Sequence, residues 1–164
     1  MEKLTGLKKI KTAVFISGAG SNLKNLIKFS VNKNSPISID LIISNTNKAK
    51  GLRFAEQYNI KKKIFNFSKA KIAERKILMQ INKDKIEFIC LAGFMKILSK
   101  NFIKKFNKKI INIHPSLLPK YKGLNTHERA IKNKDEFAGC TVHYVTEKLD
   151  SGKIIIQKKI RIKT

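Results

Sequence analysis

TAVFISGAGSN, which spans Thr12–Asn22, is the stretch of sequence that decides the fold. Its first part, Thr12–Ile16, is apolar and rich in β-formers, which is typical of a strand buried on both faces. The glycine-containing segment Ser17–Ser21 ends that strand. Apolar residues then recur at helical spacing, at Leu23, Leu26, Ile27 and Val31. A buried strand, a glycine turn and an amphipathic helix in this order predict the first unit of a parallel α/β sheet.

The same alternation of strands and helices continues through the next part of the chain. Further strands are expected at Ile37–Ile43, Ile64–Phe65, Ile86–Leu91 and Ile110–Ile113. Three helices are expected between them: one that ends near Tyr58 and turns Leu52 and Ala55 inward, one marked by Ile72, Leu78, Met79 and Ile81, and one marked by Phe102, Ile103 and Phe106. This order predicts an α/β protein with a Rossmann-like, doubly wound and mostly parallel sheet.

The pattern changes after Pro115. A helix is expected near His127–Asn133, followed by strands at Cys140–Val145 and Ile154–Ile156. A connection as short as Glu147–Gly152 joins neighbouring strands in antiparallel fashion. We therefore expect an antiparallel C-terminal strand pair. We also expect residues 1–10 to form a loose leader and residues 11–164 to form a single domain.

The chain is strongly basic. Its 164 residues include 36 Lys and Arg against 11 Asp and Glu, which gives a formal net charge of +25. Only four of the basic residues are Arg, the side chain whose planar fork reads bases and phosphates best: Arg53, Arg75, Arg129 and Arg161. The lysines are scattered through every segment, so a compositional bias of the genome explains them, and we expect no nucleic-acid partner. The charge would still steer anionic small molecules toward the protein.

The composition also indicates the cellular compartment in which we expect the protein. No apolar run reaches the length of about 20 residues that crosses a bilayer. The start of the chain has no long apolar stretch typical of a secretory signal. Cys90 lies in an apolar run and is expected to be a small buried hydrophobe, not half of a disulfide. The three His and two Cys show no metal-ligand spacing, so we expect a cytoplasmic protein without membrane or metal.

A first candidate site is the loop Gly18–Asn22. Glycines allow close backbone approach, and the free N–H groups at the start of a helix favour an anion, typically phosphate. Ser21 and Asn22 would add side-chain donors. The spacing matches neither the dinucleotide-binding fingerprint nor the Walker loop. The alternative is an ordinary glycine turn whose helix is capped by Ser21.

A second candidate site combines an amide with an imidazole. Asn112 and His114 are two residues apart on a strand and would project from the same face, and Pro115 would end the strand there. Ligands of open α/β sheets bind at the carboxyl ends of strands. An amide donor beside an imidazole can stabilise an oxyanion and move a proton. The alternative is a hydrogen-bonded His at a strand end.

A carboxylate could complete this second site. Asp150, in the turn Leu149–Gly152, would favour the protonated form of an imidazole beside it. Nothing local shows that Asp150 and His114 meet, and the alternative is a turn-capping Asp. His143 lies inside an apolar strand and is expected to be a packed, hydrogen-bonded residue and not a ligand.

These motifs together resemble those of a known enzyme family. The matching stretches occur in family order and are Ile16–Leu23, Leu91–Leu98, Asn112–Pro119, Gly139–Val145 and Leu149–Gly152. With them, the chain resembles the folate-dependent formyltransferases, and most closely those that act on phosphoribosylglycinamide in purine synthesis. The similarity covers nearly all of residues 11–162, and it implies the formyltransferase fold.

The resemblance implies a role for each motif. Gly20, Ser21 and Asn22 would hold the phosphate of the ribosyl-glycinamide. Asn112 would stabilise the oxyanion, His114 would donate a proton, and Asp150 would keep His114 charged. The residues implied to line the folate site are Met95, Lys96, Ile97, Leu98, Asn112, Thr146, Glu147, Lys148, Leu149 and Asp150. The glycinamide amine would attack the formyl carbon of the co-substrate 10-formyltetrahydrofolate, without a metal or a covalent enzyme intermediate.

Three other functions stay open at this point. Methionyl-tRNA formyltransferase normally carries an additional C-terminal tRNA-binding domain. Formyltetrahydrofolate deformylase normally has a second His where this chain has Pro115. A non-catalytic basic binding protein on the same fold is the third. The family also continues past its final strand into a helix, which we expect to be lacking here, so activity of this form and its state as monomer or homodimer remain to be measured.

Overall fold

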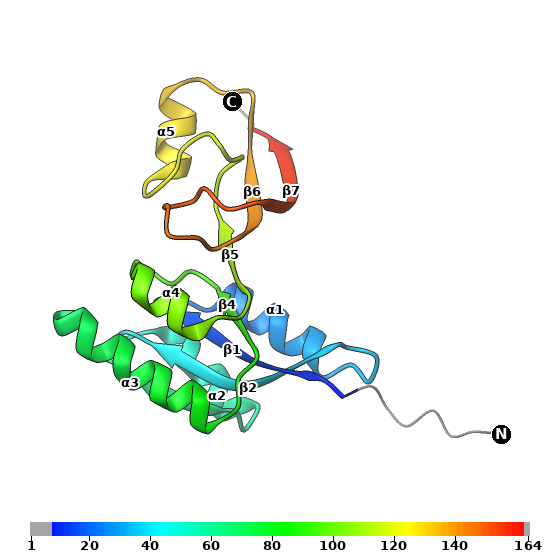
Figure 1. The fold of residues 1–164 in the computed structure, drawn as a ribbon. Coiled ribbons are helices and arrows are strands. Elements are labelled where there is room, and N and C mark those ends of the chain that lie inside the picture. The colour runs from blue at the N-terminus through cyan, green and yellow to red at the C-terminus, as the bar shows by residue number, and fades with distance from the viewer. Residues whose placement is uncertain (1–7, 163–164) are drawn as a thin grey trace. The chain divides into compact units, whose positions relative to one another are not determined.

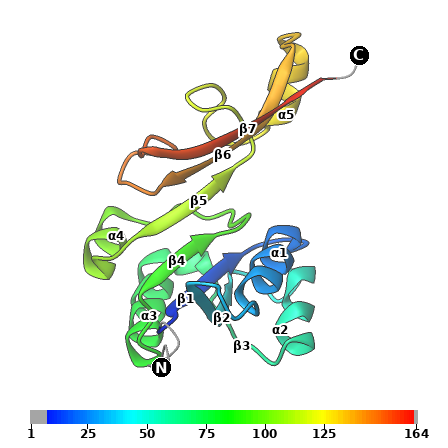
Figure 2. The same ribbon diagram turned by 90° about the vertical axis from the view of Figure 1, so that its right-hand side faces the viewer.

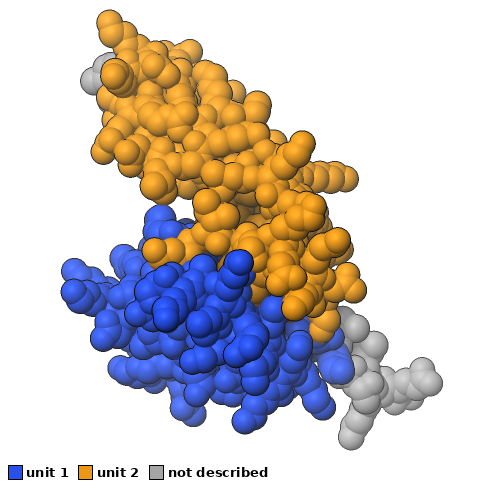
Figure 3. Space-filling model, turned by 60° about the vertical axis from the view of Figure 1, so that its left-hand side comes forward, with its two compact units in different colours: residues 1–95 blue, residues 96–164 orange. Residues whose placement is uncertain are grey.

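The computed structural model describes residues 8–162. The chain forms two compact units, Met1–Met95 and Lys96–Thr164 (Figure 3). Residues 1–7 of the expected leader lie outside the described residues, and the first strand begins at Ile10. Within the described residues, no helix is both long and apolar enough to cross a membrane.

Over residues 8–95, the first unit is built on four parallel strands in the order β3-β2-β1-β4. The strands are β1 (Ile10–Ile16), β2 (Ile37–Ser44), β3 (Lys61–Ile64) and β4 (Phe88–Leu91), labelled in Figure 2. In register, Val14 lies between Ile42 and Cys90. Neighbouring strands pair with both edges of β1 and helices cover both faces of the sheet (Figure 2), so Ala13–Ile16 have no exposed surface. The apolar stretch that decided the prediction is therefore the centre of the core.

Helices cover both faces of this sheet. They are α1 (Ser21–Ser30), the short helix η1 (Lys50–Leu52), α2 (Arg53–Gln57), the short helix η2 (Phe67–Lys69) and α3 (Ala70–Lys83). Figure 2 shows α1 and α2 on one side of the sheet and α3 on the other. Right-handed crossovers require this arrangement, because the chain moves outward from β1 to β3 and then returns to β4. The unit is doubly wound, as expected.

Two details of the first unit differ from the prediction. The buried face of α3 is formed by Ala73, Ile77 and Ile81, whereas Ile72 and Met79 are exposed. These three buried residues are four positions apart and form one apolar face, so Ile72 and Met79 lie on the outer face of the helix. The third strand is Lys61–Ile64 and not Ile64–Phe65. It is a fully exposed edge strand, and lysines are common at such edges because they discourage pairing with other chains.

In its described part, which ends at residue 162, the second unit contains two helices and three antiparallel strands. Its elements are α4 (Lys100–Phe106), β5 (Ile110–His114), α5 (Thr126–Lys132), β6 (Phe137–Tyr144) and β7 (Ile154–Arg161), labelled in Figure 1. β6 pairs with both β5 and β7, in antiparallel fashion. The expected fold class is confirmed, although β6 and β7 are longer than predicted.

Cys90 is buried in β4, as the sequence predicted. Burial raises the pKa of its thiol to about 12, because the thiolate would lose its hydration there. The thiol is therefore protonated at neutral pH and packs as a small hydrophobic side chain.

Candidate active site

The glycine loop of the first unit joins β1 to α1. Gly20 is the N-cap residue of α1, with a φ of +78°, and Ser21 is the first helical residue. Among the residues that the structure describes, no side chain caps this helix. The alternative in which Ser21 caps the helix is therefore wrong, because the left-handed conformation at Gly20 moves Ser21 into the first turn. The first N–H groups of α1 are those that an anion would bond.

Close packing fixes the shape of this loop. A Cβ atom on Gly20 would lie 2.6 Å from the Cα atom of Gly51, so only glycine fits there. The N–H group of Gly51 donates to the carbonyl of Gly18 at 2.9 Å. The loop is thus held against the start of η1, with the side chain of Ser21 exposed and that of Asn22 half-buried.

Ser17 connects the same loop to the segment after β4. Its hydroxyl donates to Asn45 Oδ1 and accepts from the N–H group of Met95 at 2.8 Å. Its own N–H group donates to the carbonyl of Gly93 at 3.1 Å. Met95, the first residue implied to line the folate site, is held by its backbone while its side chain is 65% exposed.

In the second unit, the structure brings together the three side chains implied to be catalytic. His114 Nδ1 lies 3.5 Å from Asp150 Oδ2, and both side chains are more than 90% buried. Asn112 stands two residues before His114 on β5. Asp150 comes from the connection between β6 and β7, where its φ is +45°. Its Oδ2 atom also accepts from the N–H group of Gly123 at 2.9 Å, so Asp150 does not act as a simple turn cap.

The second ring nitrogen of His114 has an acceptor of its own. His114 Nε2 lies 2.9 Å from the carbonyl oxygen of Tyr121. A carbonyl oxygen only accepts, so Nε2 carries a proton. Nδ1 faces the carboxylate of Asp150. The two ring nitrogens of His114 therefore face two oxygen acceptors.

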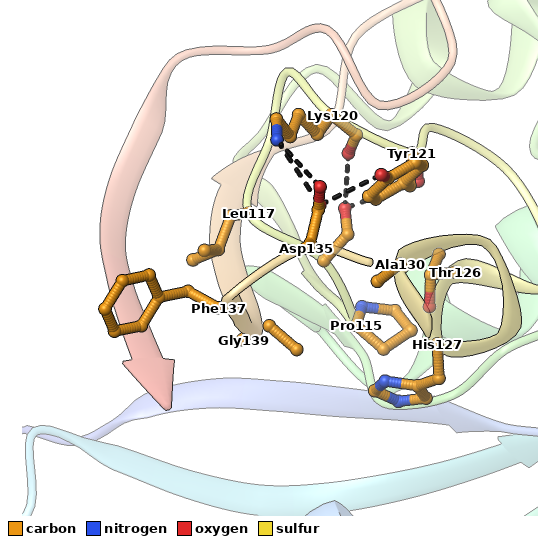
Figure 4. A pocket seen from close by; sticks show the side chains of 12 residues that line it. Pro115, Leu117, Lys120, Tyr121, Thr126, His127, Ala130, Asp135, Phe137 and Gly139 are labelled. Carbon is orange, nitrogen blue, oxygen red and sulfur yellow. Dashed lines mark hydrogen bonds and ion pairs between the residues drawn. The ribbon is translucent and has the colours of Figure 1, made fainter. Parts of the chain in front are cut away.

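A hydrogen-bond network anchors the loop that supplies this carbonyl. Asp135 Oδ2 accepts from the Tyr121 hydroxyl at 2.9 Å, and Lys120 Nζ donates to the same carboxylate (Figure 4). The hydrogen bond from Tyr121, aided by Lys120, lowers the pKa of Asp135 below its usual range. Ser116 Oγ donates to the carbonyl of Lys120 at 2.7 Å. This network borders a small pocket beside α5.

His143 is a member of the cluster that the sequence did not reveal. It is 2% exposed and hydrogen-bonded, as expected of a packed residue. However, its Nε2 atom also lies 3.3 Å from Asn112 Nδ2 and 3.6 Å from Asp150 Oδ1. Asn112 and His143 are direct partners in the β5–β6 register. Register between two strands cannot be read from one sequence, so no signal would have placed His143 here.

The segments implied to line the folate site differ in exposure. Ile97 is 72% exposed and Leu149 is 50% exposed, whereas Leu98 is buried and packs as a core residue. Lys100, at the start of α4, forms an ion pair of 2.7 Å with Glu147. Thr146 Oγ1 donates to the carbonyl of Lys148. This ion pair ties the segment that begins at Thr146 to the N-terminus of α4.

Metal-ligating side chains do not gather in the described part of the chain. Among residues 8–162, no group of three or more His, Cys, Asp or Glu side chains is arranged to hold a metal ion.

The fold and this cluster define a class of enzymes that transfer one-carbon groups, and comparison with known proteins agrees. The formyl transferase family matches residues 10–164, and the chain belongs to that family. It is 44% identical over 155 residues to phosphoribosylglycinamide formyltransferase of Haemophilus influenzae, covering 93% of this chain and 73% of the relative. It is 43% identical over 159 residues to the human trifunctional purine biosynthetic protein adenosine-3, covering 95% of this chain and 16% of that much longer protein.

Solved structures lead to the same family. The crystal structure of phosphoribosylglycinamide formyltransferase from Anaplasma phagocytophilum has a TM-score of 0.88 and 41% identity, covering 94% of this chain and 73% of that one. The enzyme of the same name from Brucella melitensis has a TM-score of 0.88 and 40% identity, covering 94% and 81%.

Proposed function

We propose that the chain transfers the formyl group of 10-formyltetrahydrofolate to the amine of 5-phosphoribosyl-glycinamide. The observation that carries this proposal is the cluster of Asn112, His114 and Asp150, in which a buried imidazole faces a buried carboxylate at 3.5 Å. An amide, a protonated imidazole and a carboxylate are what acyl transfer to an amine requires. The names of the relatives support the choice of formyl donor and acceptor.

The reaction proceeds through a tetrahedral intermediate. The amine nitrogen attacks the formyl carbon, and the carbonyl electrons move onto oxygen. The Asn112 carboxamide donates a hydrogen bond to this oxyanion, and the charge of His114 stabilises it further. When the intermediate collapses, the bond from carbon to the folate nitrogen breaks. That nitrogen gains a proton, the amine nitrogen loses one, and tetrahydrofolate leaves.

His114 is suited to the proton transfers because of its two neighbours. Its Nε2 proton is held by the carbonyl of Tyr121 at 2.9 Å. Its Nδ1 atom is 3.5 Å from Asp150, longer than the 2.7–2.9 Å typical of a charge-assisted hydrogen bond. Since Nδ1 has no close hydrogen bond to the described residues, we assign the proton transfer to this nitrogen. Asp150 stabilises the positive charge before the transfer and receives the returning proton through water.

Substrate binding is assigned to the remaining motifs. Gly20, Ser21 and Asn22 hold the phosphate at the start of α1. Met95, Lys96 and Ile97 contact the folate together with the exposed segment Thr146–Leu149. The net charge of +25 raises the local concentration of both substrates, which are anions. We further propose that the partners are these small molecules and that the enzyme works in the cytoplasm.

One assay tests this function. The protein is mixed with 5-phosphoribosyl-glycinamide and 10-formyltetrahydrofolate, and release of tetrahydrofolate is followed together with formylation of the amine. We expect turnover that requires both substrates. Release of tetrahydrofolate without the glycinamide would instead indicate a deformylase. A folded sample that shows no turnover would contradict the proposal.

A further inference from the structure

We propose that His143 is a positioning residue that fixes the orientation of the Asn112 carboxamide. This inference rests on the proposed function, in which Asn112 donates to the oxyanion. An amide side chain presents an NH₂ group on one side and a carbonyl on the other, and only the NH₂ group can stabilise an oxyanion. Something in the protein must therefore select between the two orientations.

The tautomer of His143 follows from its contact with the backbone. His143 Nδ1 lies 2.9 Å from the carbonyl oxygen of Tyr144. Because that oxygen only accepts, Nδ1 carries the proton. In a neutral imidazole the other nitrogen, Nε2, is then an acceptor.

This acceptor determines how Asn112 is oriented. Nε2 of His143 lies 3.3 Å from Asn112 Nδ2, so the amide nitrogen donates one hydrogen to it. The second hydrogen of the same NH₂ group is the one that the proposed function assigns to the oxyanion. With the amide reversed, its carbonyl oxygen would face the lone pair of Nε2, and the two acceptors would repel each other.

Asp150 does not displace Asn112 from this acceptor. Asp150 Oδ1 lies 3.6 Å from His143 Nε2, beyond the usual range of a hydrogen bond, whereas Asn112 Nδ2 lies nearer, at 3.3 Å. The other oxygen of the same carboxylate, Oδ2, faces His114 Nδ1 and accepts from the N–H group of Gly123.

Glycine at position 152 keeps the backbone acceptor in place. A Cβ atom on Gly152 would lie 1.8 Å from the carbonyl oxygen of Tyr144. Only glycine therefore allows this carbonyl to occupy the position in which it accepts from His143 Nδ1. The orientation of Asn112 is thus traced through His143 to a backbone atom, and Asn112 and His143 are direct cross-strand partners.

Two isosteric substitutions separate the two ring nitrogens. His143→Gln places an amide oxygen near the position of Nε2 and keeps an acceptor for Asn112. His143→Asn places its amide near the position of Nδ1, keeps a donor for the Tyr144 carbonyl and loses the acceptor. We expect kcat to fall about 10²-fold in His143→Asn, as when an oxyanion donor is lost. KM for both substrates should change little, and His143→Gln should restore most of the rate. Equal kcat values in the two variants would overturn the proposal.

A measurement that needs no activity makes the test independent of the proposed function. Nitrogen NMR of the native protein labelled in histidine reports which ring nitrogen carries the proton, and His114→Ala and His127→Gln assign the remaining signals. We expect a protonated Nδ1 and an unprotonated Nε2 at His143. A protonated Nε2 would overturn the proposal whether or not the enzyme turns over. A protein that shows the expected tautomer but no formyl transfer would contradict the proposed function alone.

Discussion

His114 Nδ1 and Asp150 Oδ2 lie 3.5 Å apart, although one residue ends β5 and the other follows β6. Both side chains are nearly inaccessible to water, so the carboxylate acts on the imidazole through a medium that screens charge poorly. The N–H group of Gly123 and the carbonyl of Tyr121 complete their surroundings. We therefore expect the catalytic role of His114 to depend on Asp150.

Replacing Asp150 with Asn tests this dependence. Asp150→Asn keeps an acceptor for Gly123 but removes the negative charge that faces His114. We expect kcat to fall by about 10²–10⁴-fold, the range for loss of general acid–base catalysis, with a smaller change in KM. Steady-state kinetics at saturating concentrations of both substrates measures the effect. An Asp150→Asn variant within twofold of the native kcat would show that the carboxylate charge is dispensable.

The glycine loop offers a matched pair of substitutions. An alanine at position 20 would keep a φ of +78°, which is strained for any residue with a Cβ atom, and its Cβ atom would lie 2.6 Å from the Cα atom of Gly51. A Cβ atom on Gly18 would meet nothing within 4 Å. We expect Gly20→Ala to lower the free energy of unfolding by about 1–3 kcal/mol and to raise KM for the phosphate-bearing substrate. Gly18→Ala should change stability far less. Denaturant unfolding and substrate titration of both variants check this, and equal behaviour would argue against a tightly built loop.

The Tyr121–Asp135 hydrogen bond predicts a pH dependence of stability. Because this hydrogen bond lowers the pKa of Asp135 in the folded state, the stabilisation is present above the pKa of the unfolded state and is lost as pH falls through the lower folded value. Tyr121→Phe should therefore lower the melting temperature at neutral pH. The difference from the native protein should shrink in acid.

The control for Tyr121→Phe is Tyr58→Phe, since the Tyr58 hydroxyl makes no hydrogen bond to the described residues. Thermal unfolding of both variants across the acidic range provides the comparison. A destabilisation by Tyr121→Phe that stays constant as Asp135 becomes protonated would contradict the assigned cause.

Much of the first unit could be predicted from local sequence. Thr12–Ile16 lies in the interior strand β1, because a continuous apolar run fits a position covered on both faces. The face of α3 could not be predicted in the same way. Ile72 and Met79 are as apolar as Ile77 and Ile81, and the sheet beneath the helix decides which of them are buried.

The candidate site was predictable in part, for a similar reason. Asn112 and His114 share a short motif, and the family resemblance added Asp150. The contacts of His143 and the carbonyl of Tyr121 depend on strand register and on the course of a loop. Neither can be recognised in a single sequence. Every residue has a backbone carbonyl, so residue identity does not show which one accepts a hydrogen bond, and strand register depends on pairing between segments distant in the chain.

The rate of formyl transfer by His114→Ala, relative to the native protein, tests the central claim most directly. Both proteins are assayed for tetrahydrofolate release with 5-phosphoribosyl-glycinamide and 10-formyltetrahydrofolate at saturation, after their folding has been verified. We expect kcat to fall by about 10²–10⁴-fold, because the proton donor is lost while the substrate-binding loops remain. A folded His114→Ala variant as fast as the native enzyme would contradict it.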